Sequence, residues 1–232
     1  MYDTILLDIE GTTTPIDFVH KTLFPFAKKR VAEHVASNFD RLAGEIAELK
    51  IEHSLEVDSP IRFDEGSPDS VSDYLKHLID VDRKSTPLKS IQGEIWREGF
   101  ESGELVSTVF DDVPRAFERW TDQSKRIAIF SSGSVLAQQL LFRYTDHGDL
   151  TRWISNYFDT NVGSKRESTS YETIAREIDS EAASILFVSD LSAELEAARN
   201  AGMQVTLSIR PGNAVMAPTR KGTSIHTFDE LD

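Results

Sequence analysis

Two carboxylates separated by one residue follow a short apolar run near the beginning of the sequence. Asp8 and Glu10 come after the apolar residues 5–7, and Gly11 stands directly behind them. One carboxylate of such a pair can attack an electrophile while the other moves a proton, and a metal ion can be held beside both. An ordinary strand and polar turn would show the same residues, so the pair alone leaves structure and chemistry open.

Polar residues also end two later apolar runs. Ser131 and Ser132 follow residues 126–130, and Asp190 comes shortly after residues 184–188. The carboxyl ends of parallel strands meet at one edge of an α/β sheet, where ligands bind. We therefore expect these side chains to converge with the first two carboxylates. Phosphotransfer needs carboxylates, hydroxyls and backbone amides gathered in this way.

The runs that carry these residues are expected to be strands of one sheet. In the second half of the sequence, apolar runs at 126–130, 184–188 and 204–209 alternate with segments of helical spacing. The form Thr-Ser-Tyr-Glu at 169–172 predicts a capping box that opens one of these helices. The alternation predicts an α/β fold, a Rossmann-like, doubly wound parallel sheet with helices on both faces.

The block between the first strand and this alternating half has mostly helical spacing. Residues 57–70 are polar and acidic, with two prolines and a glycine, and are expected to form a loop. Thr86 is expected to cap a later helix, with Pro87 at its first position. Trp96 and Phe100 lie four residues apart on that helix and are expected to pack inside the block.

Composition excludes several classes of function. The 232 residues include no cysteine, which excludes disulfides, thiolate nucleophiles and cysteine-ligated zinc. The formal net charge of −14 argues against nucleic acid and anionic membranes as partners. No apolar run is long enough for a membrane span or a signal peptide, so we expect a cytoplasmic protein, with nuclear presence open if the source is eukaryotic. A monomer is expected, because no apolar surface repeat is present.

Residues 8–12, Asp-Ile-Glu-Gly-Thr, resemble the nucleophile motif of the haloacid dehalogenase-like phosphohydrolases, whose usual form is Asp-x-Asp-x-Thr. Glutamate in the second acidic position, followed by three threonines, Pro and Ile, is similar to the enolase-phosphatase branch of methionine salvage. Further matches cover nearly the whole chain in order: Ser-Ser-Gly-Ser at 131–134, Phe-Asp-Thr-x-Val-Gly-x-Lys at 158–165, and Arg-Pro-Gly-Asn-Ala at 210–214. The last motif is not needed for phosphate hydrolysis in general, so it favours this branch.

The resemblance implies a role for each acidic residue. Asp8 matches the nucleophile that forms an aspartyl-phosphate and also binds Mg²⁺. Glu10 matches the acid/base position, with its backbone carbonyl expected on the metal, and Asp190 matches the acidic metal motif. One Mg²⁺ per subunit is therefore expected, held by Asp8, Glu10 and Asp190. Two interpretations of Glu194 remain: it could orient a metal-bound water, or it could be a solvated helix residue.

The remaining matched residues are implied to handle phosphate. Ser131 and Ser132, with nearby backbone amides, match the phosphate-binding position, and Lys165 matches the lysine that stabilises both the phosphate and the nucleophile. The resemblance divides the chain into a catalytic core of residues 1–16 and 111–232 and a helical cap domain of residues 17–110.

The implied substrate is a small phosphorylated diketone, 2,3-diketo-5-methylthiopentyl 1-phosphate. The implied reaction first forms its enol phosphate and then releases phosphate, leaving the acireductone 1,2-dihydroxy-3-keto-5-methylthiopentene. Glu10 is hypothesised to act as the base in the first step and the acid in the second. Three alternatives remain open: another capped phosphatase acting on a sugar phosphate or nucleotide, a phosphomutase, and a non-catalytic phospho-ligand binding protein.

Overall fold

The computed structural model describes residues 2–57, 59–213 and 223–231. The chain forms two compact units: Met1–Val19 with Val106–Asp232, here called the sheet unit, and His20–Leu105, here called the helical unit. The predicted domain boundaries lie near these divisions, and the assignment of a catalytic core and a cap stays a prediction. Ala214 of the Arg-Pro-Gly-Asn-Ala motif lies outside the described residues.

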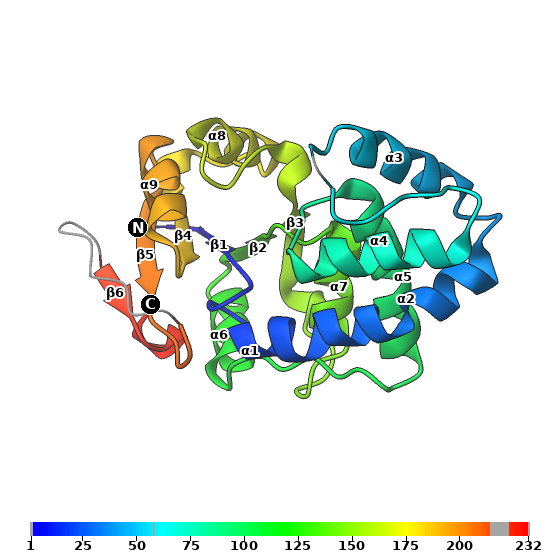
Figure 1. Ribbon diagram of the computed structural model, residues 1–232. Helices are drawn as coiled ribbons and strands as arrows, with labels where there is room; N and C mark the ends of the chain where they lie inside the picture. Colours follow the sequence, from blue (N-terminus) through cyan, green and yellow to red (C-terminus); the bar gives the residue numbers. More distant parts are fainter. Residues whose placement is uncertain (1, 58, 214–222, 232) are drawn as a thin grey trace. The chain divides into compact units, whose positions relative to one another are not determined.

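The sheet unit contains a six-stranded sheet in the order β3-β2-β1-β4-β5-β6 (Figure 1). All of the pairings between these neighbouring strands are parallel. The strands are β1 (Thr4–Leu7), β2 (Arg126–Phe130), β3 (Ile154–Phe158), β4 (Ile185–Ser189), β5 (Gln204–Ser208) and β6 (Thr223–Ile225). The predicted parallel sheet and α/β class are confirmed.

Helices cover both faces of this sheet. Successive side chains of a strand point to opposite faces, so a strand whose residues are all buried must be covered on both. Leu6, Phe130 and Phe187 share one core cluster with side chains of α8 (Ser168–Glu177) and α9 (Ser192–Asn200). The intervening residues of β1, β2 and β4 are equally buried, and α6 (Asp112–Asp122) packs against β2 (Figure 1). β1 lies between β2 and β4, so its carboxyl end is central.

The sequence analysis did not predict two of the strands, β3 and β6. β3 reads Ile-Ser-Asn-Tyr-Phe, with an exposed or half-buried residue at each central position, because it is an edge strand. β6 has three residues and also lies at an edge. Only strands buried on both faces produce the continuous apolar runs that the prediction relied on.

The predicted capping box of α8 is wrong. The N-cap of α8 is Glu167, and no side chain caps it. Ser170, a member of the expected box, instead donates its hydroxyl hydrogen to the backbone carbonyl of Ser164 at 2.7 Å. By contrast, α7 (Val135–Arg143) has a side-chain cap, since Ser134 Oγ accepts from the Ala137 N–H at 3.3 Å.

The helical unit contains α2 (Phe24–Asn38), α3 (Ala43–Ser54), α4 (Pro68–Asp80) and α5 (Thr86–Glu101). A π-helical turn, Val19–Leu23, and the short α1 (Ile16–Phe18) precede α2.

Two boundaries predicted for the helices of this unit are wrong. Helix α4 begins within the expected loop 57–70, because Ser67 caps it and Pro68 fits its first turn. Ser85, rather than Thr86, caps α5 by accepting from the Leu88 N–H.

Trp96 and Phe100 are buried in the helical unit, as expected. The indole N–H of Trp96 donates to the Leu23 carbonyl at 3.0 Å, and its ring stacks on Phe24 with centroids 6.3 Å apart. None of the helices in the described ranges combines the length and apolar composition that a membrane span requires.

Candidate active site

A tightly closed loop, residues 8–14, follows β1 and is called the nucleophile loop here. The Ile9 carbonyl accepts the backbone N–H groups of Thr12, Thr13 and Thr14 at 3.1, 2.9 and 2.9 Å. The Gly11 N–H donates to the Thr14 carbonyl at 2.8 Å. All three threonines are fully buried, so the loop is packed as firmly as the strand before it. Asp8 is thereby held at the centre of the sheet edge.

Asp8 shares a buried ammonium group with Glu194. Lys165 Nζ lies 2.5 Å from Asp8 Oδ1 and 2.7 Å from Glu194 Oε2. All three residues are at least 90% buried. Ser189, the last residue of β4, donates its hydroxyl hydrogen to Glu194 Oε2 at 2.9 Å, and Tyr171 donates to the Lys165 carbonyl at 2.7 Å. The lysine is therefore fixed beside the proposed nucleophile.

Glu194 is not a solvated helix residue, so that interpretation is wrong. It lies in the first turn of α9 with 5% of its surface exposed. The sequence carries a signal that could have identified it: a hydroxyl at the end of a buried strand and a carboxylate five residues later, in the first turn of the next helix. The hydrogen bond from Ser189 uses this spacing.

The electrostatics of the site are dominated by excess negative charge. Burial raises the pKa of Asp190 to about 7, and the charges of Asp8 and Glu194 act in the same direction. Glu10 adds to this shift, whereas Lys165 opposes it. Burial alone would lower the pKa of Lys165, but Asp8 and Glu194 outweigh burial and raise it. The site thus gathers four carboxylates and one ammonium group.

Glycine at position 11 lets two oxygen atoms approach the nucleophile loop. A Cβ there would lie 2.5 Å from Asp190 Oδ2 and 2.9 Å from Asn213 Oδ1, and the φ angle of Gly11 is +70°. Asn213 Oδ1 is buried and has no hydrogen-bond partner among the described residues. Oxygen ligands with surplus negative charge fit a hard cation such as Mg²⁺.

The carboxylates do not form a metal site by themselves. Within the described ranges, no three acidic, histidine or cysteine side chains gather closely enough to hold an ion. Asp8 and Asp190 would therefore need backbone, water or substrate oxygens to complete the coordination. Glu10 lies in the nucleophile loop, where its backbone forms a bridge with Thr14. The expected ligand set of two carboxylates and the Glu10 carbonyl stays a prediction.

Ser131 and Ser132 follow β2, which pairs directly with β1 in parallel register. Ser131 is half-buried, its N–H donates to the Phe158 carbonyl at 3.1 Å, and its Oγ accepts from the Gly133 N–H at 3.3 Å. Gln138 is buried and donates to the Gly133 and Phe158 carbonyls, both at 2.8 Å. The serines thus lie at the same sheet edge as Asp8.

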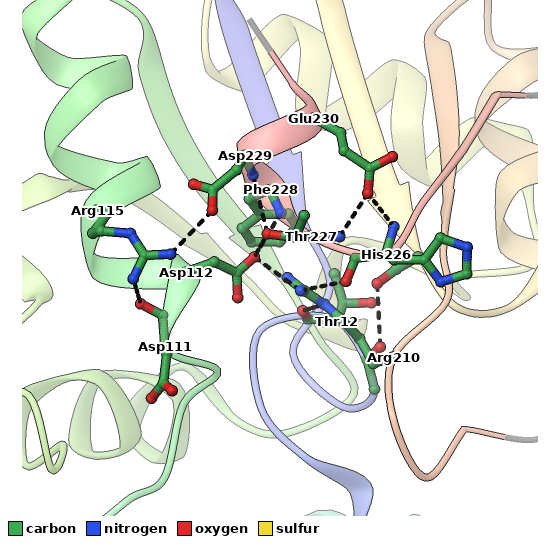
Figure 2. Close-up of polar contacts among 12 residues, drawn as sticks. Thr12, Asp111, Asp112, Arg115, Arg210, His226, Thr227, Phe228, Asp229 and Glu230 are labelled. Carbon is green, nitrogen blue, oxygen red and sulfur yellow. Dashed lines mark hydrogen bonds and ion pairs between the residues drawn. The ribbon is translucent and has the colours of Figure 1, made fainter.

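A second buried ion pair lies beside the nucleophile loop, and sequence reasoning missed it. Arg210 Nη1 lies 2.8 Å from Asp112 Oδ2, and Arg210 Nε donates to the Thr12 carbonyl at 3.1 Å. Figure 2 shows both contacts, together with the exposed pair of Arg115 and Asp229 nearby. Arg210 was recognised as part of a motif, but nothing in the local sequence indicates that Asp112 is its partner.

Comparisons with known proteins agree with this architecture. The sequence model of a family described as haloacid dehalogenase-like hydrolase matches residues 2–202. Enolase-phosphatase E1 of Synechococcus elongatus is 50% identical over 232 residues, covering 98% of this chain and 97% of that protein. A Sorghum bicolor protein, named as a probable bifunctional methylthioribulose-1-phosphate dehydratase/enolase-phosphatase E1, is 41% identical, covering 98% of this chain and 46% of that protein.

A solved structure is similar along the entire chain. The UTR4 protein of Saccharomyces cerevisiae has a TM-score of 0.83 and 34% identity, and the alignment covers 100% of both chains. The family match includes Asp8, Lys165 and Asp190, the residues whose side chains the fold gathers at the sheet edge. The chain therefore belongs to the haloacid dehalogenase-like hydrolase family and, within it, to the enolase-phosphatase E1 family.

Proposed function

We propose that this protein is a Mg²⁺-dependent enolase-phosphatase. Its substrate would be 2,3-diketo-5-methylthiopentyl 1-phosphate, and its products phosphate and the acireductone 1,2-dihydroxy-3-keto-5-methylthiopentene, a step of methionine salvage. Support comes from the enolase-phosphatase E1 relatives that match nearly all of the chain. The fusion of such a domain with a methylthioribulose-1-phosphate dehydratase in the sorghum relative supports a substrate produced by dehydrating a sugar phosphate.

The observation that carries the proposal is the buried arrangement of Asp8, Lys165 and Glu194. Lys165 Nζ contacts a carboxylate oxygen of both acids, at 2.5 and 2.7 Å. A phospho-ligand binding protein has no need of a buried carboxylate at the centre of its anion site, because that charge would repel phosphate. If Asp8 is a nucleophile with a compensating lysine beside it, its catalytic role explains why the unfavourable burial of this carboxylate is retained.

In the proposed phosphatase step, a carboxylate oxygen of Asp8 attacks phosphorus and the bond to the enol oxygen breaks. The leaving oxygen takes a proton from Glu10, and water then hydrolyses the aspartyl-phosphate with Glu10 as base. Lys165 stabilises the negative charge on the transferred phosphoryl group, and Ser131 and Ser132 bind its oxygens. Asp8 is regenerated and free phosphate leaves.

In the proposed enolisation step, Glu10 removes a proton from the carbon that carries the phosphate ester. The adjacent carbonyl acidifies this proton, and the electron pair moves onto the carbonyl oxygen. Asp8, Asp190 and the Glu10 carbonyl would hold Mg²⁺, which neutralises negative charge on the phosphate and the enolate when bound. A Glu10→Gln variant that still enolised at the wild-type rate would refute this role for Glu10.

The sheet unit carries all of the proposed catalytic residues, so we assign it as the catalytic core and the helical unit as the cap domain.

We also propose a cytoplasmic monomer. Sedimentation at several protein concentrations tests the monomer, since a dimer would show a concentration-dependent mass.

The deciding experiment follows the diketone phosphate with Mg²⁺, recording enol absorbance in the ultraviolet and phosphate release together. We expect an enol signal and stoichiometric phosphate, both lost when a chelator is added. Hydrolysis of generic phosphate esters without activity on the diketone would move the function to another capped phosphatase. Return of the phosphoryl group to a second hydroxyl of the substrate would identify a phosphomutase.

A further inference from the structure

Two side chains from the segment after β5 hold consecutive carbonyls of the nucleophile loop. Asn213 Nδ2 donates to the Gly11 carbonyl at 2.9 Å, and Arg210 Nε donates to the Thr12 carbonyl at 3.1 Å. Ser208, the last residue of β5, also donates to the Gly11 carbonyl at 3.4 Å. Arg210 and Asn213 are called the carbonyl clamp here. Contacts of this kind fix the orientation of two successive peptide planes.

Arg210 is itself immobilised. It is 5% exposed, and its guanidinium carbon lies 4.7 Å from the ring centroid of Phe110 and 4.4 Å from that of Phe228. Its Nη1 contacts Asp112 at 2.8 Å (Figure 2). A guanidinium held between two rings and a carboxylate has lost its conformational freedom already, so its hydrogen bond to Thr12 is made at little further entropic cost.

Asp112 is anchored in turn at the beginning of α6. Its Oδ2 accepts from the Phe228 N–H at 2.6 Å and from the Thr227 hydroxyl at 3.1 Å (Figure 2). The charges of Asp112 and Arg210 balance each other, so this pair has no need of an external ion. The clamp therefore rests on a rigid base formed by α6 and the residues after β6.

We propose that Arg210 and Asn213 are positioning residues for the reaction: by holding the Gly11 and Thr12 carbonyls, they fix where Glu10 presents its carboxylate and backbone carbonyl beside Asp8. This inference rests on the proposed function, because it takes the nucleophile loop as the catalytic loop. Glu10 precedes Gly11, which has a φ angle of +70° and lacks a Cβ, so without the clamp the backbone there is free to adopt other conformations. A shift of about 1 Å in a catalytic group can cost up to roughly 100-fold in rate.

The test uses one variant for each half of the clamp. Asn213→Ala removes the donor to Gly11. The double variant Arg210→Met/Asp112→Asn removes the donor to Thr12 without leaving a buried charge unpaired, which keeps the loss of stability small. For each variant we would measure kcat and KM for phosphate release, the Mg²⁺ dissociation constant by calorimetry, and hydrogen exchange of the nucleophile-loop amides.

We expect kcat to fall by about 10- to 100-fold with a much smaller change in KM. Mg²⁺ should bind several-fold more weakly and the loop amides should exchange faster, while the melting temperature stays near that of the wild type. Arg115→Met is the matched control: it removes an arginine from the same polar network (Figure 2), and should leave all of these values unchanged.

Wild-type kcat and Mg²⁺ affinity in both clamp variants would overturn the inference. So would a loss of kcat that tracks a loss of folded protein, because that is the result of a purely structural role. If the wild-type protein itself does not act on the diketone, the proposed function fails. The Mg²⁺ affinity and the exchange of the loop amides would then still test whether Arg210 and Asn213 position the nucleophile loop, since neither measurement requires that substrate.

Discussion

Two buried groups of paired charges lie beside the nucleophile loop, and they differ in charge balance. Lys165 is shared between Asp8 and Glu194, with Asp190 and Glu10 adding further negative charge. Arg210 is paired with Asp112, and its remaining contacts are carbonyls and aromatic rings, which carry no net charge. The first group is left with surplus charge and the second is neutral.

The difference teaches how to recognise function from electrostatics alone. Burying a balanced pair is tolerable, since each charge compensates the other, and backbone carbonyls accept from Nε and Nη1 of Arg210. Burying surplus carboxylates destabilises the fold, so such a cluster persists where a ligand or an ion supplies the missing charge. We therefore expect changes in the Lys165 group to reduce activity more than stability. Changes that leave one charge of the Arg210 pair unbalanced should reduce stability in addition to the kcat lost with the carbonyl clamp.

The largest expected effect comes from Asp8→Asn. Phosphate release should fall by roughly 10⁴-fold or more, as in other enzymes that lose their nucleophile. The free energy of unfolding should not decrease by more than about 1 kcal/mol, because Asp190 and Glu194 lose a repelling neighbour. Urea unfolding and phosphate release measured on the same preparation provide the test. A variant that unfolds much more easily than the wild type would contradict the view that the surplus negative charge of this cluster destabilises the fold.

Lys165→Met and Arg210→Met sharpen the comparison, since each removes one buried cation. Lys165→Met should reduce phosphate release by roughly 10²- to 10³-fold through lost stabilisation of the phosphoryl group. Arg210→Met should lower kcat less, by about 10- to 100-fold, through loss of the carbonyl clamp. It should also lower the free energy of unfolding by about 3 kcal/mol, because Asp112 is left buried without a compensating cation. If the two variants lost activity and stability in the same proportion, the distinction between the groups would be wrong.

Magnesium should stabilise the protein through the unbalanced group alone. At a free concentration 100 times its dissociation constant, Mg²⁺ should add about 2.7 kcal/mol to the free energy of unfolding. Asp190→Asn should remove most of this gain, whereas Asp112→Asn should retain it. Melting curves with and without Mg²⁺ measure both. An equal gain in the Asp190 variant would place the ion elsewhere, and NaCl at the same ionic strength controls for general ionic effects.

The smallest effect is expected for Glu194→Gln. Glutamine keeps the shape of the side chain and the hydrogen bond from Ser189, but removes one of the two charges that hold Lys165. We expect kcat to fall by about 10-fold, the lower end of what loss of a supporting partner costs. Glu196→Gln, on the same helix outside this contact, serves as control. Unchanged kcat would mean that Asp8 alone orients the lysine.

Much of this molecule follows from local sequence. The strands that end at Asp8, Ser131 and Asp190 are buried on both faces, so their apolar runs identify them without any tertiary information. Gly11 after the two carboxylates is typical of a tight turn, and a turn is decided by neighbouring residues. The convergence of these strand ends follows from parallel topology, which the alternation of helix and strand already requires.

Tertiary structure decided what depends on residues that are distant in sequence. The edge strands β3 and β6 exist because a neighbouring strand is available for pairing, and their residues show no continuous apolar pattern. The partnership of Arg210 with Asp112 joins segments that only the completed sheet brings together. The same holds for the raised pKa of Asp190, because burial and the summed charge of its neighbours are properties of the folded chain and of no single segment.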